Sequence, residues 1–526
     1  MSMTISKYVP TLPFKKIIRD PIHGYIQLTE LEQKLLQLPA LNRLHNIRMG
    51  LGYLVWPGAK ACRFEHSLGV MHIADRMIES ILRNTPQDVI SDLFVKTFED
   101  IFKDLLKDAD RLKRLGLSEV PELAALQILR QVVRLAGLLH DVGHGPFSHI
   151  SESIMFDSLK SNERKEGCKL FNCDSEKLPT HEYFSYKMIQ DRRSNIRQQI
   201  EEYLGKRGPD IVAELLTKES RGQTIEILRK VISSQLDADR MDYLLRDSYV
   251  AGITIGMTDI DRIIMNLRIV ELSDSYILAV HERALASIED LMDARFKMYK
   301  WIYHHHLRVA YDALMREAIK HLVKSGYMEK DDFHWIAFLN GRTDDSDVLY
   351  CLKKYISSGK DDARLYKGLF DRRYAPLSLL KRRADYKRWR NDIRRAINVD
   401  IRDEDIPGVI IKWVSQTSDI AHDDRNWLVK ETNNPALRDI RLIVASPIYV
   451  PYKWVTRDDM IFIYSERVGL QELMAASDYV NAINTVWEEY APVFVAVVHT
   501  DIPKEELKKY RNSIYQALTR TVARHF

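Results

Sequence analysis

An apolar helical pattern runs directly into a group of metal-capable side chains between residues 123 and 149. In "LAALQILRQVVRLAGLLH", Leu126, Leu129 and Val133 recur at spacings of three and four, which predicts a helix with one face in a hydrophobic core. The stretch "HDVGHGPFSH" follows at once and brings three histidines and one aspartate into residues 140–149. The chain must therefore fold around a buried helix whose C-terminal end presents imidazole and carboxylate groups.

Most of the chain from residue 30 to about residue 319 has a helical pattern, including the amphipathic segments 66–82 and 225–247. Runs rich in β-branched and aromatic residues predict strands at 408–414, 441–450, 460–465 and 493–499. Helices are expected at 470–490 and at the C-terminal end. We therefore predict a mainly α fold, with a helical core over residues 1–330 and an α+β C-terminal region over residues 331–526.

The composition argues against several classes of protein. Hydrophobic residues make up 45% and charged residues 29%, which is typical of a globular protein, and a net charge of +4 creates no strong field over so large a surface. The 4 cysteines are too few for a disulfide framework, and Cys168 and Cys173 lack the second pair that a zinc site needs. No apolar run approaches the ~20 residues of a membrane span. We expect a cytoplasmic protein without a membrane partner.

Separate segments offer ligands for one divalent metal ion. His140 and Asp141 are neighbours at the end of the predicted helix, but two adjacent residues cannot fill a coordination sphere. His66 opens an amphipathic helix in "CRFEHSLGVMHIA". In "LDADRMDYLLRD", Asp239 and Asp242 are three residues apart and so share one helical face. Imidazole and carboxylate together suit a transition metal, or a metal that also binds phosphate oxygens.

Taken in order, these motifs resemble those of the HD-domain metal-dependent phosphohydrolases. The segments "DPIHGYIQL", "RFEHSLG", "HDVGHGPFSH" and "DADRMDYLLRD" look closest to the deoxynucleoside-triphosphate triphosphohydrolase branch. The similarity covers roughly residues 17–320 and carries more weight than a lone His-Asp dipeptide, because the motifs are long and ordered. It implies a helical HD-domain core and a metal-dependent hydrolase that acts on nucleotides.

The resemblance also implies roles for individual residues. The expected ligands of one divalent ion (Mn, Fe, Zn, Ni or Mg) are His66, His140, Asp141 and Asp239. The expected catalytic residues are His144, His149, Glu152 and His181. The residues expected to hold phosphates or shape the pocket are Arg63, Arg240, Tyr243, Asp247, Arg295 and Tyr303. Such a metal polarises a phosphoryl oxygen, while an imidazole donates a proton to the leaving oxygen.

Three positions depart from the family pattern. Glu152 stands where close relatives carry aspartate, Met49 and Gly50 stand where relatives often have a glutamine that contacts the sugar, and His304 also stands where they often have glutamine. The expected metal ligands therefore match, while residues that read the sugar differ. We expect hydrolysis of a nucleotide phosphate, with dNTPs cleaved to deoxynucleoside and triphosphate, and the base is left open.

Two other functions stay open from the sequence. His144 and His181 could hold a second metal ion, as in a phosphodiesterase or nuclease that cleaves single-stranded nucleic acid or a cyclic dinucleotide. The chain could instead be a non-catalytic scaffold that senses nucleotides. The adjacent histidines His304–His306 are not expected to share an ion, because successive helix positions point in different directions.

A basic segment over residues 353–395 leaves the partners open. It intersperses Lys and Arg with Tyr366, Tyr374, Tyr386 and Trp389. The pattern fits a solvated helical face, an interface or regulatory nucleotide site, or a surface that binds nucleic acid through stacked bases. The family resemblance adds the expectation of a homo-oligomer, either a dimer or a tetramer.

Overall fold

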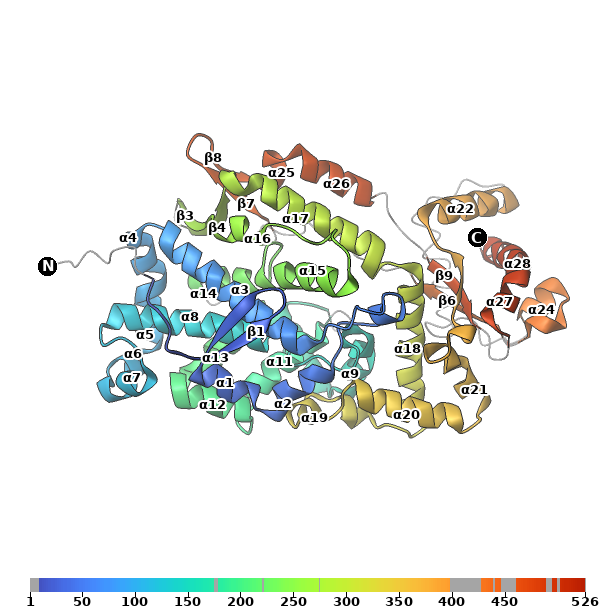
Figure 1. Cartoon of the computed structure of the whole chain (residues 1–526), viewed down its shortest axis with the longest axis horizontal. Coiled ribbons are helices and arrows are strands. Elements are labelled where there is room, and N and C mark those ends of the chain that lie inside the picture. The colour runs from blue at the N-terminus through green and yellow to red at the C-terminus, as the bar shows by residue number, and fades with distance from the viewer. Residues whose placement is uncertain are drawn as a thin grey trace.

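The computed structural model describes residues 9–174, 178–219, 222–273, 275–397, 427–438, 440–445, 460–488, 494–498 and 502–525. The fold is mainly α with small sheets, as predicted. A large helical body lies on the left of Figure 1 and a smaller α+β unit lies on the right. None of the described helices is both long enough and apolar enough to cross a membrane.

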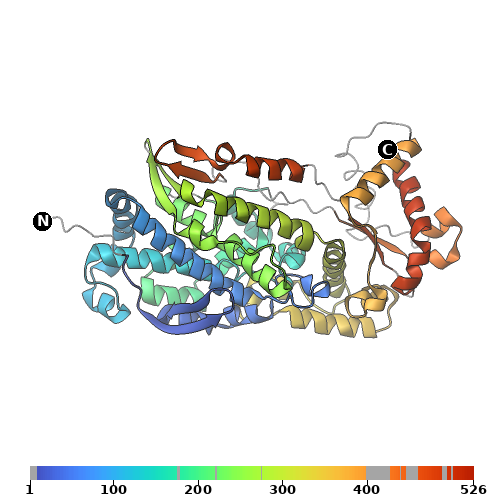
Figure 2. The same cartoon turned by 45° about the horizontal axis from the view of Figure 1, so that its top comes forward.

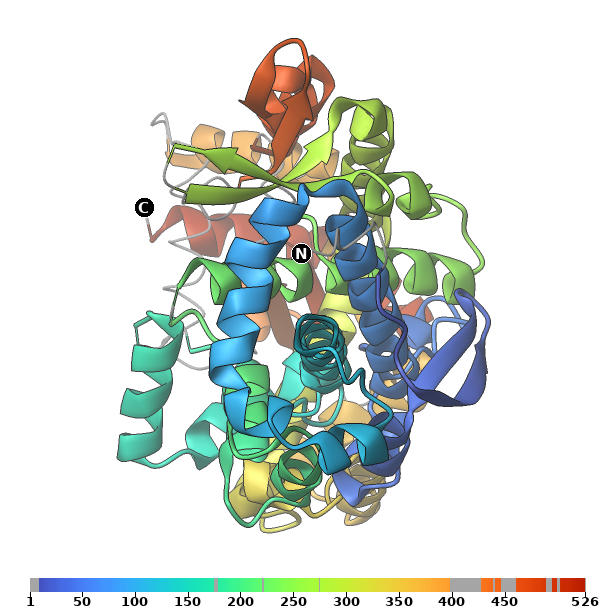
Figure 3. The same cartoon turned by 90° about the vertical axis from the view of Figure 1, so that its left-hand side faces the viewer.

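The predicted helix at residues 123–140 is α8 (Pro121–Leu139), which passes through the middle of the helical body (Figure 3). Pro121 occupies its first turn, where a missing backbone N–H costs nothing. Every residue from Ala124 to Leu139 is buried, so α8 is covered on all sides and not only on its apolar face.

Two arginines explain how α8 can be buried all round. Arg134 forms ion pairs with Glu32 and Asp75, and Arg130 forms one with Asp75. Each of these side chains is at least nine-tenths buried. A buried charge is tolerated only when it is paired and hydrogen-bonded, and this network meets that condition. It also ties α8 to the N-terminal segment that carries Glu32.

Helix α3 (Arg63–Asn84) packs closely along α8, because α8 has a glycine at the contact. A Cβ atom at Gly137 would lie 3.0 Å from the Met71 Cα. Helix α15 (Ala238–Ala251) packs on α3 in turn. Further helices of the body are α1 (Glu30–Leu36), α5 (Lys96–Ile101), α12 (Asn195–Leu204), α13 (Arg207–Glu214), α14 (Gln223–Ile232), α17 (Leu285–Met298) and α18 (His306–Lys324).

The turn after α8 is pressed against α11 (Thr180–Gln190). A Cβ at Gly143 would lie 2.3 Å from the backbone oxygen of His181, so only glycine fits this contact. The chain then passes through residues 147 and 148, which both have positive φ, and enters α9 (Glu152–Ser158). This path places the polar residues after α8 next to those at the start of α11.

An N-terminal hairpin consists of the antiparallel strands β1 (Phe14–Asp20) and β2 (Gly24–Thr29). Asp20 closes its turn by accepting hydrogen bonds from the backbone N–H groups of Ile22 and His23. Gly24 adopts a φ of 73°, which glycine reaches without strain. The motif "DPIHG" is therefore a tight turn.

The predicted strand at 460–465 returns to the helical body. It forms β7 (Phe462–Ser465) in a four-stranded sheet of order β3 (Leu267–Leu272), β4 (Ser275–His281), β7 and β8 (Gly469–Glu472). The helix predicted at 470–490 begins later than expected, because its first residues pair in β8, and α25 (Leu473–Ala476) and α26 (Asp478–Glu488) follow. Helix α26 packs on α17, as Figure 1 shows.

The smaller unit has its own hydrophobic cluster. Strand β9 (Phe494–Val498) pairs antiparallel with β5 (Leu377–Leu380) and β6 (Arg441–Ala445). Helices α22 (Arg383–Ile397), α24 (Trp427–Thr432) and α28 (Arg511–Ala523) complete the unit, which Figure 2 shows beside α18. The predicted strand at 408–414 lies outside the described residues, and the division of the chain at residue 330 stays a prediction.

The aromatic residues of the basic segment are mostly structural. Tyr366, Tyr386 and Trp389 are at most 4% exposed, and Tyr374 is half-buried. Tyr386 and Trp389 belong to the hydrophobic cluster of the smaller unit. Three of the four rings are therefore not free to stack on nucleic-acid bases.

Candidate active site

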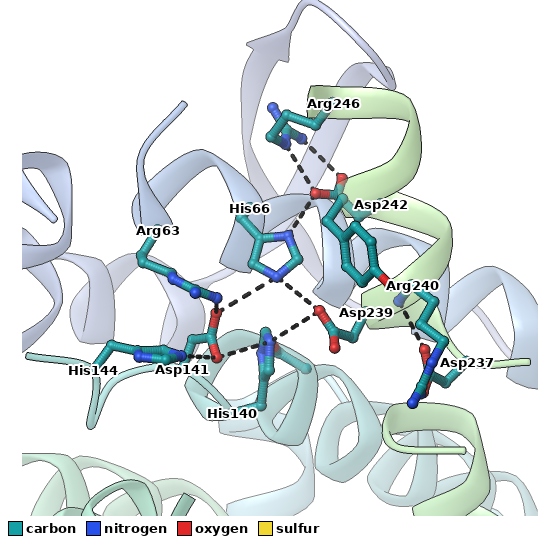
Figure 4. Close-up of polar contacts among 12 residues, drawn as sticks. Arg63, His66, His140, Asp141, His144, Asp237, Asp239, Arg240, Asp242 and Arg246 are labelled. Atoms are coloured by element: carbon teal, nitrogen blue, oxygen red, sulfur yellow. Dashed lines mark hydrogen bonds and ion pairs between the residues drawn. The ribbon is translucent and has the colours of Figure 1, made fainter. Parts of the chain in front are cut away.

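Three helix ends converge on one point in the helical body (Figure 4). His66 lies in the first turn of α3, His140 follows α8, and Asp239 lies in the first turn of α15. Their ligand atoms all lie within 4.8 Å of one another. Asp239 Oδ1 is 2.9 Å from His66 Nε2 and 3.8 Å from His140 Nε2. The structure thus brings three of the predicted metal ligands together.

Asp141, the fourth predicted ligand, contacts both imidazoles. Its Oδ2 lies 3.5 Å from His66 Nε2, and its Oδ1 lies 3.3 Å from His140 Nε2. Arg63 donates a hydrogen bond of 2.5 Å to the same Oδ2. Burial would raise the pKa of Asp141, but Arg63 and His140 hold it well below its usual range. Asp141 is therefore a charged carboxylate between the imidazoles and the guanidinium group.

The hydrogen bonds of the two histidines point their Nε2 atoms at the site. His140 Nδ1 lies 2.8 Å from the carbonyl oxygen of Gly137, which can only accept, so Nδ1 carries the proton. His66 Nδ1 lies 2.7 Å from a carboxylate oxygen of Asp242. Both Nε2 atoms are buried without a hydrogen-bond partner among the residues that the structure describes, and the short contact of His66 with Asp239 lacks hydrogen-bond geometry.

This donor set fits a divalent metal ion. The Nε2 atoms of two imidazoles and carboxylate oxygens at one point are ligands that transition metals accept. Burial alone would lower the pKa of His66, but the carboxylates of Asp239 and Asp242 raise it to about 10. The site therefore stabilises positive charge at the point where the Nε2 atoms meet Asp239, and an ion would supply that charge.

The predicted catalytic residues form a second cluster. The ligand atoms of His144, His149, Glu152 and His181 lie within 4.8 Å of one another. Glu152 Oε1 accepts from Nδ1 of His149 at 2.9 Å and from Nδ1 of His181 at 2.5 Å. The rings of His144 and His181 stack at a centroid distance of 4.0 Å and an angle of 10°.

His144 joins the two clusters, since its Nε2 lies 3.3 Å from Asp141 Oδ1. Burial and the nearby charge of Arg63 keep the pKa of His144 well below its usual range, so this ring is neutral. Burial would also lower the pKa of His181, but Glu152 raises it to about 9. The cluster thus pairs a neutral imidazole with a protonated one. The His149 side chain is 64% exposed and is the most accessible of the four.

The arginines predicted to hold phosphates occupy different places. Arg63 borders both clusters, because it bonds Asp141 and also donates to Ser148 Oγ at 2.9 Å. Arg240 is turned toward Asp237, the N-cap of α15, as Figure 4 shows. Arg295 is 2% exposed and donates to Gln235 Oε1 at 2.9 Å.

The predicted pocket tyrosines meet beside α15. Tyr303 donates to Asp247 Oδ2 at 2.8 Å, and its ring lies edge-on to Tyr243 at 6.1 Å. Tyr303 ends a short π-helix that begins at Tyr299, and such helices often occur at functional sites. The hydroxyl of Tyr299 lies 3.4 Å from that of Tyr243, and Tyr299 was not among the residues predicted from the sequence. Its spacing of four residues from Tyr303 was the available signal.

Two of the departures from the family pattern, Gly50 and His304, lie near these tyrosines. A Cβ at Gly50 would lie 3.0 Å from the guanidinium group of Arg308, a residue that was not predicted from the sequence. Arg308 also lies 5.0 Å over the ring of Tyr303. His304 is 6% exposed, and burial lowers its pKa to about 4. The residues that replace the expected glutamines thus bring an arginine and a neutral histidine to this side of the site.

Family models match most of the helical body. Residues 63–247 match the HD domain, and residues 258–404 match the HD-associated region. The chain belongs to the HD-domain phosphohydrolase superfamily. All predicted metal-binding and catalytic residues lie inside the HD domain itself. Arg295 and Tyr303 lie in the HD-associated region.

Curated relatives of this HD-domain chain include proteins from all three domains of life. An uncharacterized protein of Methanocaldococcus jannaschii is 29% identical over 70% of this chain and 62% of its own length. An uncharacterized protein of Bacillus subtilis is 29% identical over 60% and 58%. The human deoxynucleoside triphosphate triphosphohydrolase SAMHD1 is 26% identical over 68% and 49%. The match thus spans about half to three-fifths of the length of these relatives.

Two solved structures share the fold of the HD-domain chain. A hypothetical protein of Aquifex aeolicus has a TM-score of 0.60 at 20% identity and covers 95% of this chain and 99% of its own. A phosphohydrolase of Bacteroides thetaiotaomicron has a TM-score of 0.56 at 21% identity and covers 92% and 99%. The similarity in fold therefore includes the smaller C-terminal unit.

Proposed function

We propose that the protein is a metal-dependent nucleotide phosphohydrolase that cleaves deoxynucleoside triphosphates to deoxynucleoside and triphosphate. One observation carries the proposal: a cluster that fits a metal and a cluster that fits proton transfer are joined by the 3.3 Å contact between Asp141 and His144. The similarity to human SAMHD1, a deoxynucleoside triphosphate triphosphohydrolase, supports the choice of substrate.

We assign the metal to the convergent ligands. His66, His140, Asp141 and Asp239 would hold a divalent ion, which polarises a phosphoryl oxygen and makes a water more acidic. Histidine and aspartate accept Mn, Fe, Zn, Ni or Mg, so the ligands leave the identity of the ion open.

We assign the proton transfer to His149. In the proposed reaction a water oxygen bonds to the α-phosphorus and releases a proton to the medium, the bond from phosphorus to the 5′ oxygen breaks, and that oxygen takes a proton from His149. His149 is the exposed imidazole of its cluster, and the carboxylate of Glu152 orients it through Nδ1. His181 holds the same Glu152 oxygen from behind. Glu152, which stands where the family resemblance implies aspartate, thus contacts both imidazoles.

We assign the remaining predicted residues to the nucleotide. Arg63 and Arg240 flank the metal cluster and would bind phosphate oxygens as forked donors. Tyr243, Asp247 and Tyr303 would face the sugar. Arg295 would act through Gln235 in the loop before α15.

A product-resolved assay tests the proposal. Purified protein is incubated with each dNTP and NTP in Mn²⁺, and the products are separated by ion-pair chromatography. The expected product is inorganic triphosphate in a one-to-one ratio with nucleoside. A matched control is His525→Gln, a remote histidine at the end of α28, which should keep full activity. Release of diphosphate or monophosphate, or no turnover with any nucleotide, would overturn the proposed reaction.

A phosphodiesterase with a second ion in the cluster of His144, His149, Glu152 and His181 is the competing function. The ligand atoms lie within 4.8 Å, which favours it. The parallel stack of His144 on His181 disfavours it, because the lone pairs of stacked rings run side by side and do not converge. Metal analysis decides between them: one ion per chain is expected, and two would favour the phosphodiesterase. A homo-oligomer and a regulatory nucleotide stay predictions.

A further inference from the structure

One motif of the sequence has no part in the chemistry assigned so far. "DPIHG" forms the turn between β1 and β2, in a hairpin far from α15 along the chain. Nevertheless His23 Nε2 reaches Asp242 Oδ1 at 2.6 Å. Asp20 in the same turn accepts from Arg246 Nη1 at 2.9 Å. The turn is therefore bonded to α15 by two side chains.

Asp242 is the centre of these contacts and is fully buried. Arg246, one turn further along α15, grips both of its oxygens at 2.9 Å (Figure 4). His66 Nδ1 lies 2.7 Å from Oδ2. The arginine fork requires a charged carboxylate, and a charged carboxylate only accepts hydrogen bonds. Asp242 therefore fixes the proton of His66 on Nδ1 and leaves Nε2 with its lone pair toward the metal cluster.

A second observation shows that this position is built into α3. Gly69 lies three residues after His66, and a Cβ there would be 1.8 Å from Asp242 Oδ1 and 2.7 Å from Arg246 Nη2. Only glycine lets the carboxylate lie against the helix that carries His66. The glycine of "RFEHSLG" and the last aspartate of "DADRMD", Asp242, thus fit each other.

We propose that Asp242, held by Arg246 and His23 and seated on Gly69, is the positioning residue that sets the tautomer and orientation of His66 as a metal ligand. The inference rests on the proposed metal site. Carboxylates that bond the outer nitrogen of a metal-binding histidine raise its basicity, and their loss typically lowers metal affinity by about 10–100-fold. The turn of the N-terminal hairpin would then serve the metal site without contacting the metal.

Metal titration tests the role of Asp242 without any substrate. The apoprotein is titrated with Mn²⁺ by calorimetry and with Co²⁺ by visible absorption, which reports the ligand set. Asp242→Asn should raise the Kd for both ions by about 10–100-fold. Gly69→Ala should act in the same direction, because the added methyl group displaces the carboxylate. His23→Gln, which leaves the arginine fork intact, should give a smaller rise.

The matched control is Asp75→Asn, the same change in another buried carboxylate that two arginines hold, on the same helix as His66. It should lower thermal stability and leave the Kd of the folded protein unchanged. If Asp242→Asn fails to fold, His23→Gln carries the test alone, and an unchanged Kd there refutes the inference. Unchanged affinity in folded Asp242→Asn refutes the inference while leaving the proposed function intact. A wild-type protein that binds neither ion refutes the proposed function first.

Discussion

The two histidine clusters on either side of Asp141 are held in different ways. His66 donates a hydrogen bond from Nδ1 to the buried carboxylate of Asp242. His140 donates one from Nδ1 to the backbone carbonyl of Gly137, so both acceptors are held in place. His149 and His181 share one oxygen of Glu152, whose side chain is 30% exposed. The rings of His66 and His140 are thus held by two separate buried acceptors, while those of His149 and His181 are held by one partly exposed carboxylate.

This contrast fits the two tasks we propose. A metal site needs lone pairs that keep their direction, and immobile acceptors provide that. Proton transfer needs a group that a substrate can reach and that can exchange its proton, which the exposed ring of His149 provides. Burial and hydrogen-bond partners therefore separate the roles of residues that look alike in the sequence.

The largest expected effect comes from removing the fixed cluster. The double variant His140→Ala, Asp141→Ala should lose the bound metal and lose more activity than the roughly 10²–10⁴-fold that acid–base assistance supplies. Both side chains lie at the convergence point, so the variant removes two of the four proposed ligands. Elemental analysis and the triphosphate assay check this together. A variant that keeps a full complement of tightly bound metal would show that these residues are not the ligands.

The next effect should come from the exposed cluster. His149→Gln removes the proposed proton donor and should lower kcat by roughly 10²–10⁴-fold with the metal content unchanged. A solvent-exposed site accepts the change without a packing defect, so the fold should survive. Activity within a few-fold of wild type would contradict the assignment, and His181→Gln would then be measured as the alternative donor.

Much of the site could be predicted because its residues lie in long helical patterns. The apolar spacing around Leu129 located α8, and the motif order placed His66, His140 and Asp239 in one site. What the pattern could not show was the direction of each side chain. The phosphate role of Arg240 stays a proposal, and no sequence pattern indicated that its guanidinium group also contacts Asp237, the N-cap of its own helix. Such local competition depends on rotamers and leaves no periodic signal.

The parts that sequence patterns missed depend on contacts between distant segments. The role of Asp242 requires that a hairpin near residue 20 and a glycine in α3 both reach α15. The possible stacking role of the aromatic residues in the basic segment 353–395 was suggested by spacing alone, for a related reason. Tyr386 and Trp389 alternate with charged residues on α22, but their rings turn inward to form the core of the smaller unit. A pattern gives the spacing of residues, and only the tertiary fold decides which face is covered.

The His181–Glu152 pair of the exposed cluster should make the free energy of unfolding depend on pH. Burial lowers the pKa of His181, but Glu152 raises it to about 9, above the unperturbed value of 6.5. The pair therefore stabilises the fold fully below pH 6.5 and loses that contribution as the pH rises to about 9. The shift sets an upper bound of about 3 kcal/mol.

The other groups that face His181 also bear on this test. They are His149 on the same carboxylate, His144 on the stacked face, and the charges of Asp141 and Glu182. Glu152→Gln removes the dominant charge and keeps these neighbours. Urea unfolding of the metal-free protein at pH 6 and pH 9.5 should therefore show a smaller fall in stability for the variant than for wild type. Equal falls would mean that Glu152 does not hold a proton on His181.

The smallest expected effect is that of the exposed cluster on metal affinity, and it tests directly whether the two clusters have separate functions. If the clusters are separate in function, His149→Gln and Glu152→Gln should change the Kd for Mn²⁺ by less than about threefold, because both residues are connected to the metal ligands through the ring of His144. Calorimetric titration of the folded variants measures this. A tenfold loss of affinity would mean that Glu152 and the imidazoles around it help to bind metal. The parallel rings would then have to separate on binding, and the two clusters would be one binuclear site.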